Sequence, residues 1–393
     1  MKKTIKDYDL NNKIVLIRCD FNVPLKDGII VDDNRILESL ETINYAIDKN
    51  AKVVLFSHLG KIKSEEDKAN KSLEVVSNRL SELLNKKVLF VNETRGNNLE
   101  NAINQMSPKD VILVQNTRFE DYPNKLESGN DESLGKYWAS LGDIFINDAF
   151  GTIHRAHASN VGIAKFLPSG IGFLIEKEIN NLSKLNEPNR PYVVLMGGAK
   201  ISDKIEIISS LASKADKILI GGGMANTFVK AKELEIGKSV FDLDSVSFAK
   251  DMLNSYADKI ILPVDFKVTE EFSDNANFKI QNQDGIDIDG IALDIGPKTI
   301  SIFKEILSSA KTVFWNGTLG YSEFKNYENG TKEIMDFISK TDATTILGGG
   351  DTVAASKVMG YKEKVSYAST GGGATLEYIS GKNLPGLDAI EDK

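Results

Sequence analysis

The apolar and polar positions of the chain alternate between short hydrophobic runs and longer amphipathic stretches. In the first half, five apolar runs predict buried strands at Ile14–Arg18, Lys52–Phe56, Lys87–Val91, Val111–Gln115 and Asp143–Asn147. Helical patterns lie between them, at Ser39–Lys49, Ser72–Asn85 and Ser133–Leu141. This alternation predicts an α/β fold with parallel sheets and right-handed crossovers.

In the second half, apolar runs lead directly into clusters of glycine. These runs are Tyr192–Met196, Ile218–Ile220, Thr344–Leu347 and Val365–Thr370, and two further strands are expected at Asp258–Pro263 and Thr312–Asn316. Glycine lets the backbone approach a ligand closely, and a following helix directs its free N–H groups at an anion. The pattern predicts a polyphosphate site at the carboxyl edge of a sheet, with plain tight turns as the alternative.

A boundary between two domains is predicted near residues 168–191. Breakers stand on both sides of one amphipathic helical stretch, Phe173–Leu185, and they are Pro168, Gly170, Gly172, Pro188 and Pro191. A single helix between breakers is typical of a semi-rigid connector.

The composition is that of an ordinary globular protein. The chain has 393 residues, 41% hydrophobic and 26% charged, with a formal net charge of −8. An acidic protein is repelled by phosphate backbones, so we expect neither nucleic-acid nor membrane binding. The first residues lack the apolar stretch of a signal peptide, and nothing demands an oligomer, so we expect a soluble, cytoplasmic monomer. Cys19 is the only cysteine, which excludes an internal disulfide and a cysteine-built zinc site.

Charged and polar residues follow the predicted strands of the first half. Only seven of the 48 basic residues are arginines, and three of these (Arg35, Arg118 and Arg155) lie just beyond strand ends, as do all three histidines. Because ligands bind at that edge of open α/β sheets, the cluster predicts a site for a small, multiply charged anion such as a phosphorylated carboxylic acid. A catalytic zinc or a Ser-His-Asp triad is disfavoured, since neither HExxH nor G-x-S-x-G occurs.

In the second half, Lys200 and Lys204 follow a strand closely enough to reach neighbouring phosphates of one ligand. Asp351 opens a helical run, where it is either a cap or the hard oxygen ligand that Mg²⁺ prefers. Neither Walker A nor GxGxxG is present, so a standard P-loop and a dinucleotide fold are disfavoured.

Taken together, these segments closely resemble the phosphoglycerate kinase family from Val15 to Pro385. The motifs that carry the resemblance are VLIRCDFNVPL (15–25), SHLGK (57–61), DAFGTIHRAHAS (148–159), GGAKISDKI (197–205), GGGMANTF (221–228), LDIGPKT (293–299), GGGDTVAA (348–355) and STGGGATLE (369–377). The chain departs from the family at Lys61, where arginine is usual, at Ala292, where glycine is usual, and in WNGTLGYSE (315–323).

The resemblance implies two Rossmann-like three-layer domains with parallel sheets, joined by a hinge helix. Residues 1–172 are then a phosphoglycerate-binding domain, 173–185 the hinge, 186–374 a Mg-nucleotide-binding domain, and 375–393 a tail that docks back on the first domain. The implied reaction is reversible transfer of the acyl phosphate of 1,3-bisphosphoglycerate to ADP, giving ATP and 3-phosphoglycerate. Domain closure would bring the groups in line and expel water.

The resemblance also implies a role for individual residues. Those for the acid are Asp20, Phe21, Asn22, Arg35, His58, Leu59, Gly60, Lys61, Arg118 and Arg155. Those for the nucleotide are Lys204, Gly221, Gly222, Ala292, Glu323, Gly349, Gly350, Asp351 and Thr352, with Asp351 also the Mg²⁺ ligand. Arg35, Lys200, Gly371, Gly372 and Gly373 would surround the phosphoryl group in flight.

Two alternatives to this reaction stay open on the sequence. One is an ATP-dependent kinase of the same architecture that acts on a different carboxylic acid. The other is a nucleotide-binding protein without turnover, although such a relative should have lost Lys200, Arg35 or Asp351, and all three are present.

Overall fold

The computed structural model describes residues 1–393, apart from the side chain of Asp203. The chain forms two compact units, one made of Met1–Asn180 and Asn383–Lys393, the other of Asn181–Lys382. Among the described residues, no helix combines the length and apolar character needed to cross a bilayer.

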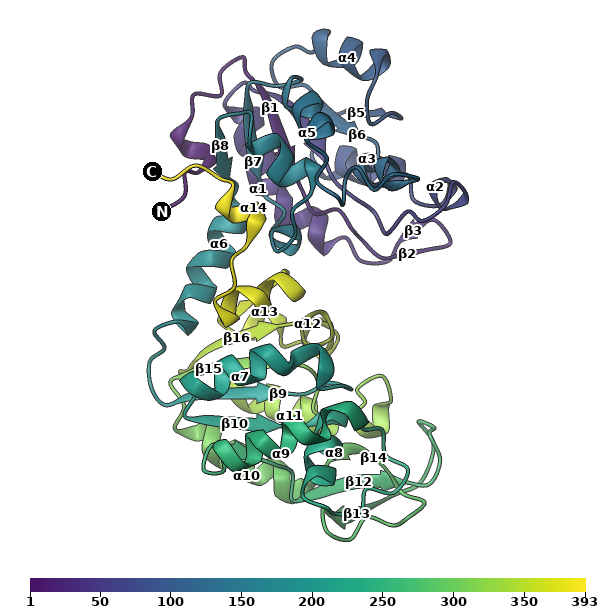
Figure 1. Ribbon diagram of the computed structural model, residues 1–393, viewed down its shortest axis with the longest axis vertical. Coiled ribbons are helices and arrows are strands. Elements are labelled where there is room, and N and C mark those ends of the chain that lie inside the picture. Colours follow the sequence, from purple (N-terminus) through teal and green to yellow (C-terminus); the bar gives the residue numbers. More distant parts are fainter. The chain divides into compact units, whose positions relative to one another are not determined.

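The first unit is built on a six-stranded parallel sheet in the order β5-β6-β4-β1-β7-β8 (Figure 1). Its strands are β1 (Ile14–Arg18), β4 (Lys52–Phe56), β5 (Val88–Val91), β6 (Val111–Val114), β7 (Ile144–Asn147) and β8 (Ser169–Ile171), with a separate hairpin of β2 (Leu25–Lys26) and β3 (Ile29–Ile30). Its helices are α1 (Asn34–Asp48), α2 (Glu66–Ala69), α3 (Glu74–Leu83), α4 (Asn97–Asn104), α5 (Glu132–Ala139), α6 (Phe173–Leu182) and α14 (Pro385–Asp388).

Successive residues of these strands point to opposite faces of the sheet, and helices cover both faces. Val15 and Val53 belong to the core cluster that includes residues of α1 and α3. Phe56, with the opposite orientation in β4, has its ring centroid 5.5 Å from that of Trp138 in α5. Burial on both faces explains why the strands read as continuous apolar runs.

The C-terminal residues pack on the first unit. Gly386 donates its backbone N–H to the Ile153 carbonyl at 2.8 Å and accepts from the Asn147 side chain at 3.0 Å. Lys3 and Glu391 form an ion pair of 2.6 Å. Within the segment expected to be a tail from residue 375 onward, Asn383–Lys393 belongs to the first unit, whereas Gly373–Ser380 forms α13 in the second.

The helix predicted at Phe173–Leu185 is present as α6, continued by a 3₁₀ turn at Ser183–Leu185. The two units meet along the chain within α6, at Asn180 and Asn181.

The second unit has its own six-stranded parallel sheet, in the order β11-β10-β9-β15-β16-β17. Its strands are β9 (Tyr192–Met196), β10 (Lys217–Ile220), β11 (Ile260–Ile261), β15 (Thr312–Asn316), β16 (Thr344–Gly348) and β17 (Tyr367–Ala368). Its helices are α7 (Ile205–Lys214), α8 (Gly222–Ala231), α9 (Val246–Ser255), α10 (Pro297–Ser308), α11 (Asn329–Ile338), α12 (Gly350–Val358) and α13. The predicted α/β class with parallel sheets is confirmed in both units.

One element was not anticipated, an antiparallel sheet in the order β13-β12-β14. Its strands are β12 (Asp265–Thr269), β13 (Phe278–Asn282) and β14 (Ile291–Ile295). The strand β13 is mostly exposed, so its residues carry no apolar run from which a buried strand could be predicted.

Candidate active site

The predicted acid-binding residues of the first unit follow strands that are neighbours in the sheet. Asp20 follows β1, His58 follows β4, Arg118 follows β6, and the segment to Arg155 follows β7, and the order β6-β4-β1-β7 is contiguous. Because all these strands are parallel, their carboxyl ends lie along one edge. The expected grouping of charged residues at that edge is therefore a consequence of the strand order.

Side-chain amides fix the loops at this edge. The Asn22 side chain accepts from the backbone N–H of Gly60 at 2.8 Å. Asn116 accepts from the Leu59 N–H at 3.1 Å and donates to the Leu59 carbonyl at 2.8 Å. Phe21 is fully buried, and its N–H donates to the Ser57 hydroxyl at 2.8 Å. The turn after β4 is thus held from two sides.

Arg118 is the most deeply placed of the predicted cationic residues. It is 9% exposed, its Nη1 lies 3.1 Å from a carboxylate oxygen of Asp121, and its buried Nε has no hydrogen-bond partner among the described residues. A buried guanidinium N–H without an acceptor is costly, which favours an anionic ligand there.

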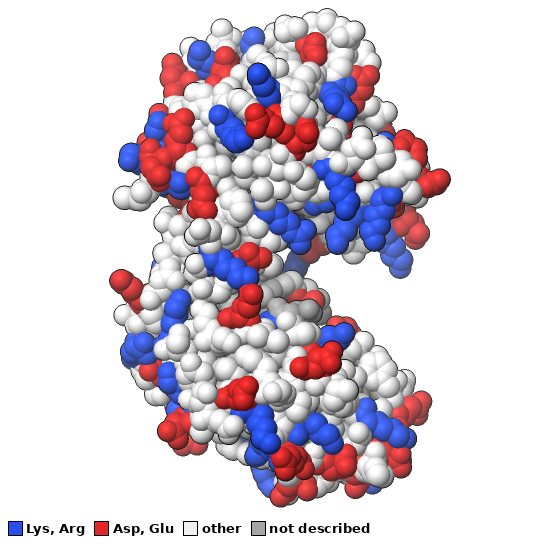
Figure 2. Space-filling view, in the orientation of Figure 1, with Lys and Arg blue, Asp and Glu red and all other residues white. Residues whose placement is uncertain are grey.

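Lys61 and Arg155 are exposed. In Figure 2, Lys and Arg side chains gather on the first unit near α2 and the β2–β3 hairpin.

Burial lowers the pKa of two of the three histidines. Burial, with Arg18 as the next cause, lowers the pKa of His58 well below its usual value. Burial, followed by Arg118, lowers the pKa of His157 to about 3. At neutral pH both rings are uncharged, so the positive charge comes from arginine and lysine rather than from these histidines.

The glycine turns of the second unit also line up along one sheet edge. They follow β10, β9, β16 and β17, and the loop after β15 stands between them. A Cβ on Gly197 would lie 2.1 Å from the Thr318 carbonyl oxygen, and one on Gly317, where φ is +91°, would lie 2.2 Å from the Gly197 carbonyl oxygen. Only glycine permits these two loops to touch.

The side chains of the predicted phosphate-binding residues differ in exposure and in hydrogen bonding. Lys200 is exposed, whereas the Lys204 ammonium donates to the Gly197 carbonyl at 2.7 Å. Thr352 is fully buried, and its hydroxyl oxygen accepts from the Gly317 N–H at 2.6 Å. Its side chain therefore joins the first turn of α12 to the turn after β15.

Asp351 lies in the first turn of α12 and is exposed, and no ion pair to it occurs among the described residues. Mg²⁺ with a nucleotide needs one or two carboxylates and fills its other positions with phosphate oxygens and waters, so this carboxylate fits such a metal.

The remaining predicted nucleotide residues lie on several elements of the second unit. Gly221 and Gly222 begin α8, and Gly349 and Gly350 begin α12. Ala292 on β14 is buried, and its N–H donates to the Ser239 hydroxyl at 2.9 Å. Glu323 is exposed in the turn after β15. The residues that precede α13 are Gly371, buried, and Gly372, at φ +55°.

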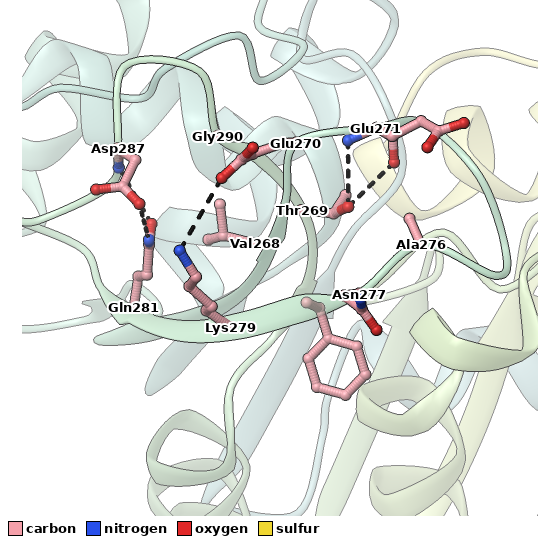
Figure 3. Close-up of a pocket in the computed structure, with 11 residues that line it drawn as sticks. Val268, Thr269, Glu270, Glu271, Ala276, Asn277, Lys279, Gln281, Asp287 and Gly290 are labelled. Atoms are coloured by element: carbon pink, nitrogen blue, oxygen red, sulfur yellow. Dashed lines mark hydrogen bonds and ion pairs between the residues drawn. The ribbon is translucent and has the colours of Figure 1, made fainter.

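A pocket of about 240 Å³ lies at the antiparallel sheet of the second unit (Figure 3). Figure 3 shows Lys279 reaching toward Glu270, at 4.0 Å, and Gln281 donating to Asp287 at 2.5 Å. None of the predicted site residues lines this pocket.

The prediction missed three residues beneath the first edge. Arg18 is fully buried at the end of β1 and contacts His58 and Ser159, and the Ser159 hydroxyl donates in turn to Glu127. The position of an arginine, a rare residue in this chain, directly at a strand end could have indicated Arg18. Because it ends an apolar run, it was counted with the strand and not with the site.

The comparisons with known proteins agree over almost the whole chain. The family model described as phosphoglycerate kinase matches residues 5–382. Two curated proteins named phosphoglycerate kinase, from Macrococcus caseolyticus and Enterococcus faecalis, are 55% and 56% identical over 395 residues, covering 100% of both chains in each case.

Solved structures agree as well. The structure of phosphoglycerate kinase from Coxiella burnetii is 36% identical, with a TM-score of 0.88, and the match covers 99% of this chain and 98% of that one. The crystal structure of phosphoglycerate kinase from Pyrococcus horikoshii is 32% identical, with a TM-score of 0.87 and 98% coverage of both chains.

Proposed function

The chain belongs to the phosphoglycerate kinase family, and from that membership we propose how its residues share the reaction. The protein is a phosphotransferase of glycolysis that transfers the acyl phosphate of 1,3-bisphosphoglycerate reversibly to ADP, giving ATP and 3-phosphoglycerate. The first unit binds the acid and the second binds the nucleotide.

The acid is held by two groups of residues in this proposal. Asp20, Asn22 and Arg35 bind its carboxylate and hydroxyl end. The phosphate is bound by His58, Lys61, Arg118 and Arg155, with the backbone of Leu59 and Gly60. The observation that carries the proposal is the buried, unpartnered Nε of Arg118, because a phosphate oxygen is the acceptor that it lacks.

The nucleotide occupies the glycine edge of the second unit. Lys204 and the N–H groups that open α12 bind its phosphates, and Asp351 holds Mg²⁺, which neutralises phosphate charge. Gly221, Gly222 and Ala292 flank the base, and Glu323 binds the ribose.

The phosphoryl group in transfer is stabilised by Arg35, Lys200 and the N–H groups of Gly371, Gly372 and Gly373. Phosphoryl transfer depends on positioning and charge stabilisation, and the attacking oxygen is already ionised, so no general base is required. Since the two substrates are assigned to different units, closure about α6 must bring them in line and exclude water.

The experiment that tests the proposal measures ATP consumption with Mg²⁺ and 3-phosphoglycerate, coupled to an NADH-dependent dehydrogenase. Glycerate, which lacks the phosphate, is the control substrate. We expect saturable turnover that requires both the metal and the substrate phosphate. Turnover with glycerate at a similar kcat/KM would contradict the assignment of the cationic edge.

One variant tests whether the acid and the nucleotide bind to different units. Arg118→Lys keeps the charge but loses the guanidinium donors, so we expect KM for 3-phosphoglycerate to rise about tenfold with KM for ATP unchanged. Arg190→Lys, at an arginine that is 56% exposed and lies in the second unit, is the matched control. An equal rise in both KM values for Arg118→Lys would count against the division of substrates between the units.

We also propose that the protein acts in the cytoplasm as a monomer and binds no nucleic acid. The net charge of −8 supports the last point, because it opposes binding to a phosphate backbone. Light scattering at the working concentration tests the oligomeric state, and a mass of two chains would contradict it.

A further inference from the structure

Arg18 is a fully buried arginine whose guanidinium group is held on three sides. Its Nε donates to the Ser159 hydroxyl at 2.8 Å, and its Nη1 donates to the Cys19 carbonyl. Its Nη2 lies 3.2 Å from Nδ1 of His58. The side chain that ends β1 is thus joined to the histidine that follows the neighbouring strand β4.

This contact decides where the His58 ring carries its proton. A guanidinium group has only donors, so Nδ1 of His58 must accept with its lone pair. The proton of the neutral ring is then on Nε2, which makes no hydrogen bond to any other residue that the structure describes. A second proton on Nδ1 would place an N–H against the N–H of Arg18.

Glu127 holds Arg18 in turn. Its carboxylate is fully buried and accepts from the Ser159 hydroxyl at 2.5 Å and from the Ser159 N–H at 2.9 Å. The Ser159 oxygen therefore connects Glu127 to Arg18, and the two buried charges of opposite sign compensate each other.

The other charged groups around His58 come from several elements. Asp20 from the loop after β1 opposes Arg18 and Arg118, the latter from the segment after β6, and His157 lies beyond β7. Asp20 is itself paired with Arg35. Burial and the two arginines together lower the pKa of His58, which agrees with the neutral ring that the contact geometry requires.

We propose that Arg18 and Glu127 are positioning residues that fix His58 as a neutral donor, with its Nε2–H directed to the phosphate of phosphoglycerate. This inference rests on the proposed function, because it takes His58 to contact that phosphate. His58 then contributes a directed hydrogen bond, and the arginines and Lys61 contribute the charge. Substrate affinity does not change through titration of this histidine.

Nitrogen-15 NMR with labelled histidine reads the tautomer in the native protein itself, and a variant is needed only to assign the signal. The chain has only three histidines, so His58→Asn assigns the signal. We expect the Nε2–H tautomer of His58 from pH 6 to pH 8 and a shift on adding 3-phosphoglycerate. An Nδ1–H tautomer, or titration with a midpoint near the ordinary histidine value of about 6.5, would overturn the proposal.

Adding 3-phosphoglycerate also separates this inference from the function on which it rests. If the tautomer is as expected but the signal stays unchanged at saturating 3-phosphoglycerate, His58 does not contact the substrate, and the directed donor is overturned together with the assignment of the phosphate site. If the signal shifts but the tautomer is Nδ1–H, only the role of Arg18 and Glu127 is overturned.

Variants test the positioning roles. Glu127→Gln removes the compensating charge and one of the two oxygens that accept from Ser159, and Arg18→Lys removes the planar group. For each we expect KM for 3-phosphoglycerate to rise about tenfold at pH 7.5, with KM for ATP unchanged, and the His58 tautomer to become mixed. Unchanged ATP affinity and circular dichroism show that the variant has folded.

Arg190→Lys again serves as the control for an exposed arginine. A His58 spectrum and a KM that are both unchanged in folded Arg18→Lys would overturn the positioning role.

Discussion

Nη1 of Arg35 donates to Oδ2 of Asp20 at 2.5 Å, so a residue in the first turn of α1 is fixed to the loop that follows β1. The Asp20 side chain is 6% exposed and that of Arg35 is 34% exposed. Burial opposes ionisation of Asp20, but Arg35, followed by the other groups around the carboxyl, outweighs it and leaves the pKa of this carboxyl below its usual value. Arg35 is therefore oriented before substrate arrives, with part of its surface still open.

Arg35→Ala should lower turnover far more than nucleotide affinity. The lost guanidinium is assigned to the transferring phosphoryl group, so we expect kcat to fall about 100-fold or more, with the ATP dissociation constant unchanged. Arg79→Ala, at an arginine of the same unit that pairs with Asp33 and Glu82, is the control. Equal losses of turnover and nucleotide affinity would argue against this role.

Gly372→Ala should separate backbone strain from function. Gly372 and Gly360 have φ values of +55° and +77°, and a Cβ on either would meet nothing within 4 Å. Each alanine variant should therefore lose a similar free energy of unfolding, about 1 kcal/mol. Only Gly372→Ala should also lower kcat, because its turn is assigned to the phosphoryl group. A similar kcat loss in Gly360→Ala would attribute the effect to strain alone.

The sequence carried most of the information on the parallel sheets. The strands at Ile14–Arg18, Lys52–Phe56, Tyr192–Met196 and Thr312–Asn316 have the predicted bounds, because strands buried on both faces form nearly continuous apolar runs. The strand β8, Ser169–Ile171, was read only as part of a boundary, since a short segment with a glycine resembles a loop.

The grouping of some candidate site residues could be predicted for a similar reason. Residues directly after buried strands reach one edge whatever their side chains, so Asp20, His58 and Arg118 could be grouped before the structure was known. The contact of the Thr352 hydroxyl with Gly317 depends on how the first turn of α12 meets the loop after β15, which no local pattern encodes. The link from Glu127 through Ser159 to Arg18 is of the same kind.

Lys61→Arg should strengthen binding of 3-phosphoglycerate. Lys61 is exposed and offers a single ammonium group, whereas arginine at this position could form a bidentate contact with the phosphate. We expect the dissociation constant, measured by calorimetry, to fall roughly threefold. Lys63→Arg, two residues away and also exposed, is the control. If both variants bind the acid equally well, the contact of residue 61 with the phosphate is refuted.

Asp148 should make the stability of the first unit depend on pH. Its carboxyl is fully buried at the start of α6, where Oδ1 accepts from Leu174 and Ile175 at 2.9 and 3.3 Å and Oδ2 has no hydrogen-bond partner among the described residues. Burial raises the pKa of Asp148 to about 8. The folded protein therefore keeps a proton that the unfolded chain, with a pKa of about 3.9, releases.

The stability of the first unit therefore falls as the pH rises between these two pKa values. The contribution of the protonated carboxyl is fully present below pH 4 and is lost as the pH rises through about 8. The amide introduced by Asp148→Asn cannot ionise, so the stability of this variant minus that of the native protein should increase from pH 5 to pH 8, by at most about 1.4 kcal/mol per pH unit.

Urea unfolding followed by Trp138 fluorescence, in a Trp315→Phe background, reports on the first unit alone. Asp143→Asn, at an exposed aspartate that accepts from the Ile14 N–H, controls for loss of a carboxylate. Parallel pH profiles for Asp148→Asn and the native protein would show that the Asp148 carboxyl is ionised in the folded state.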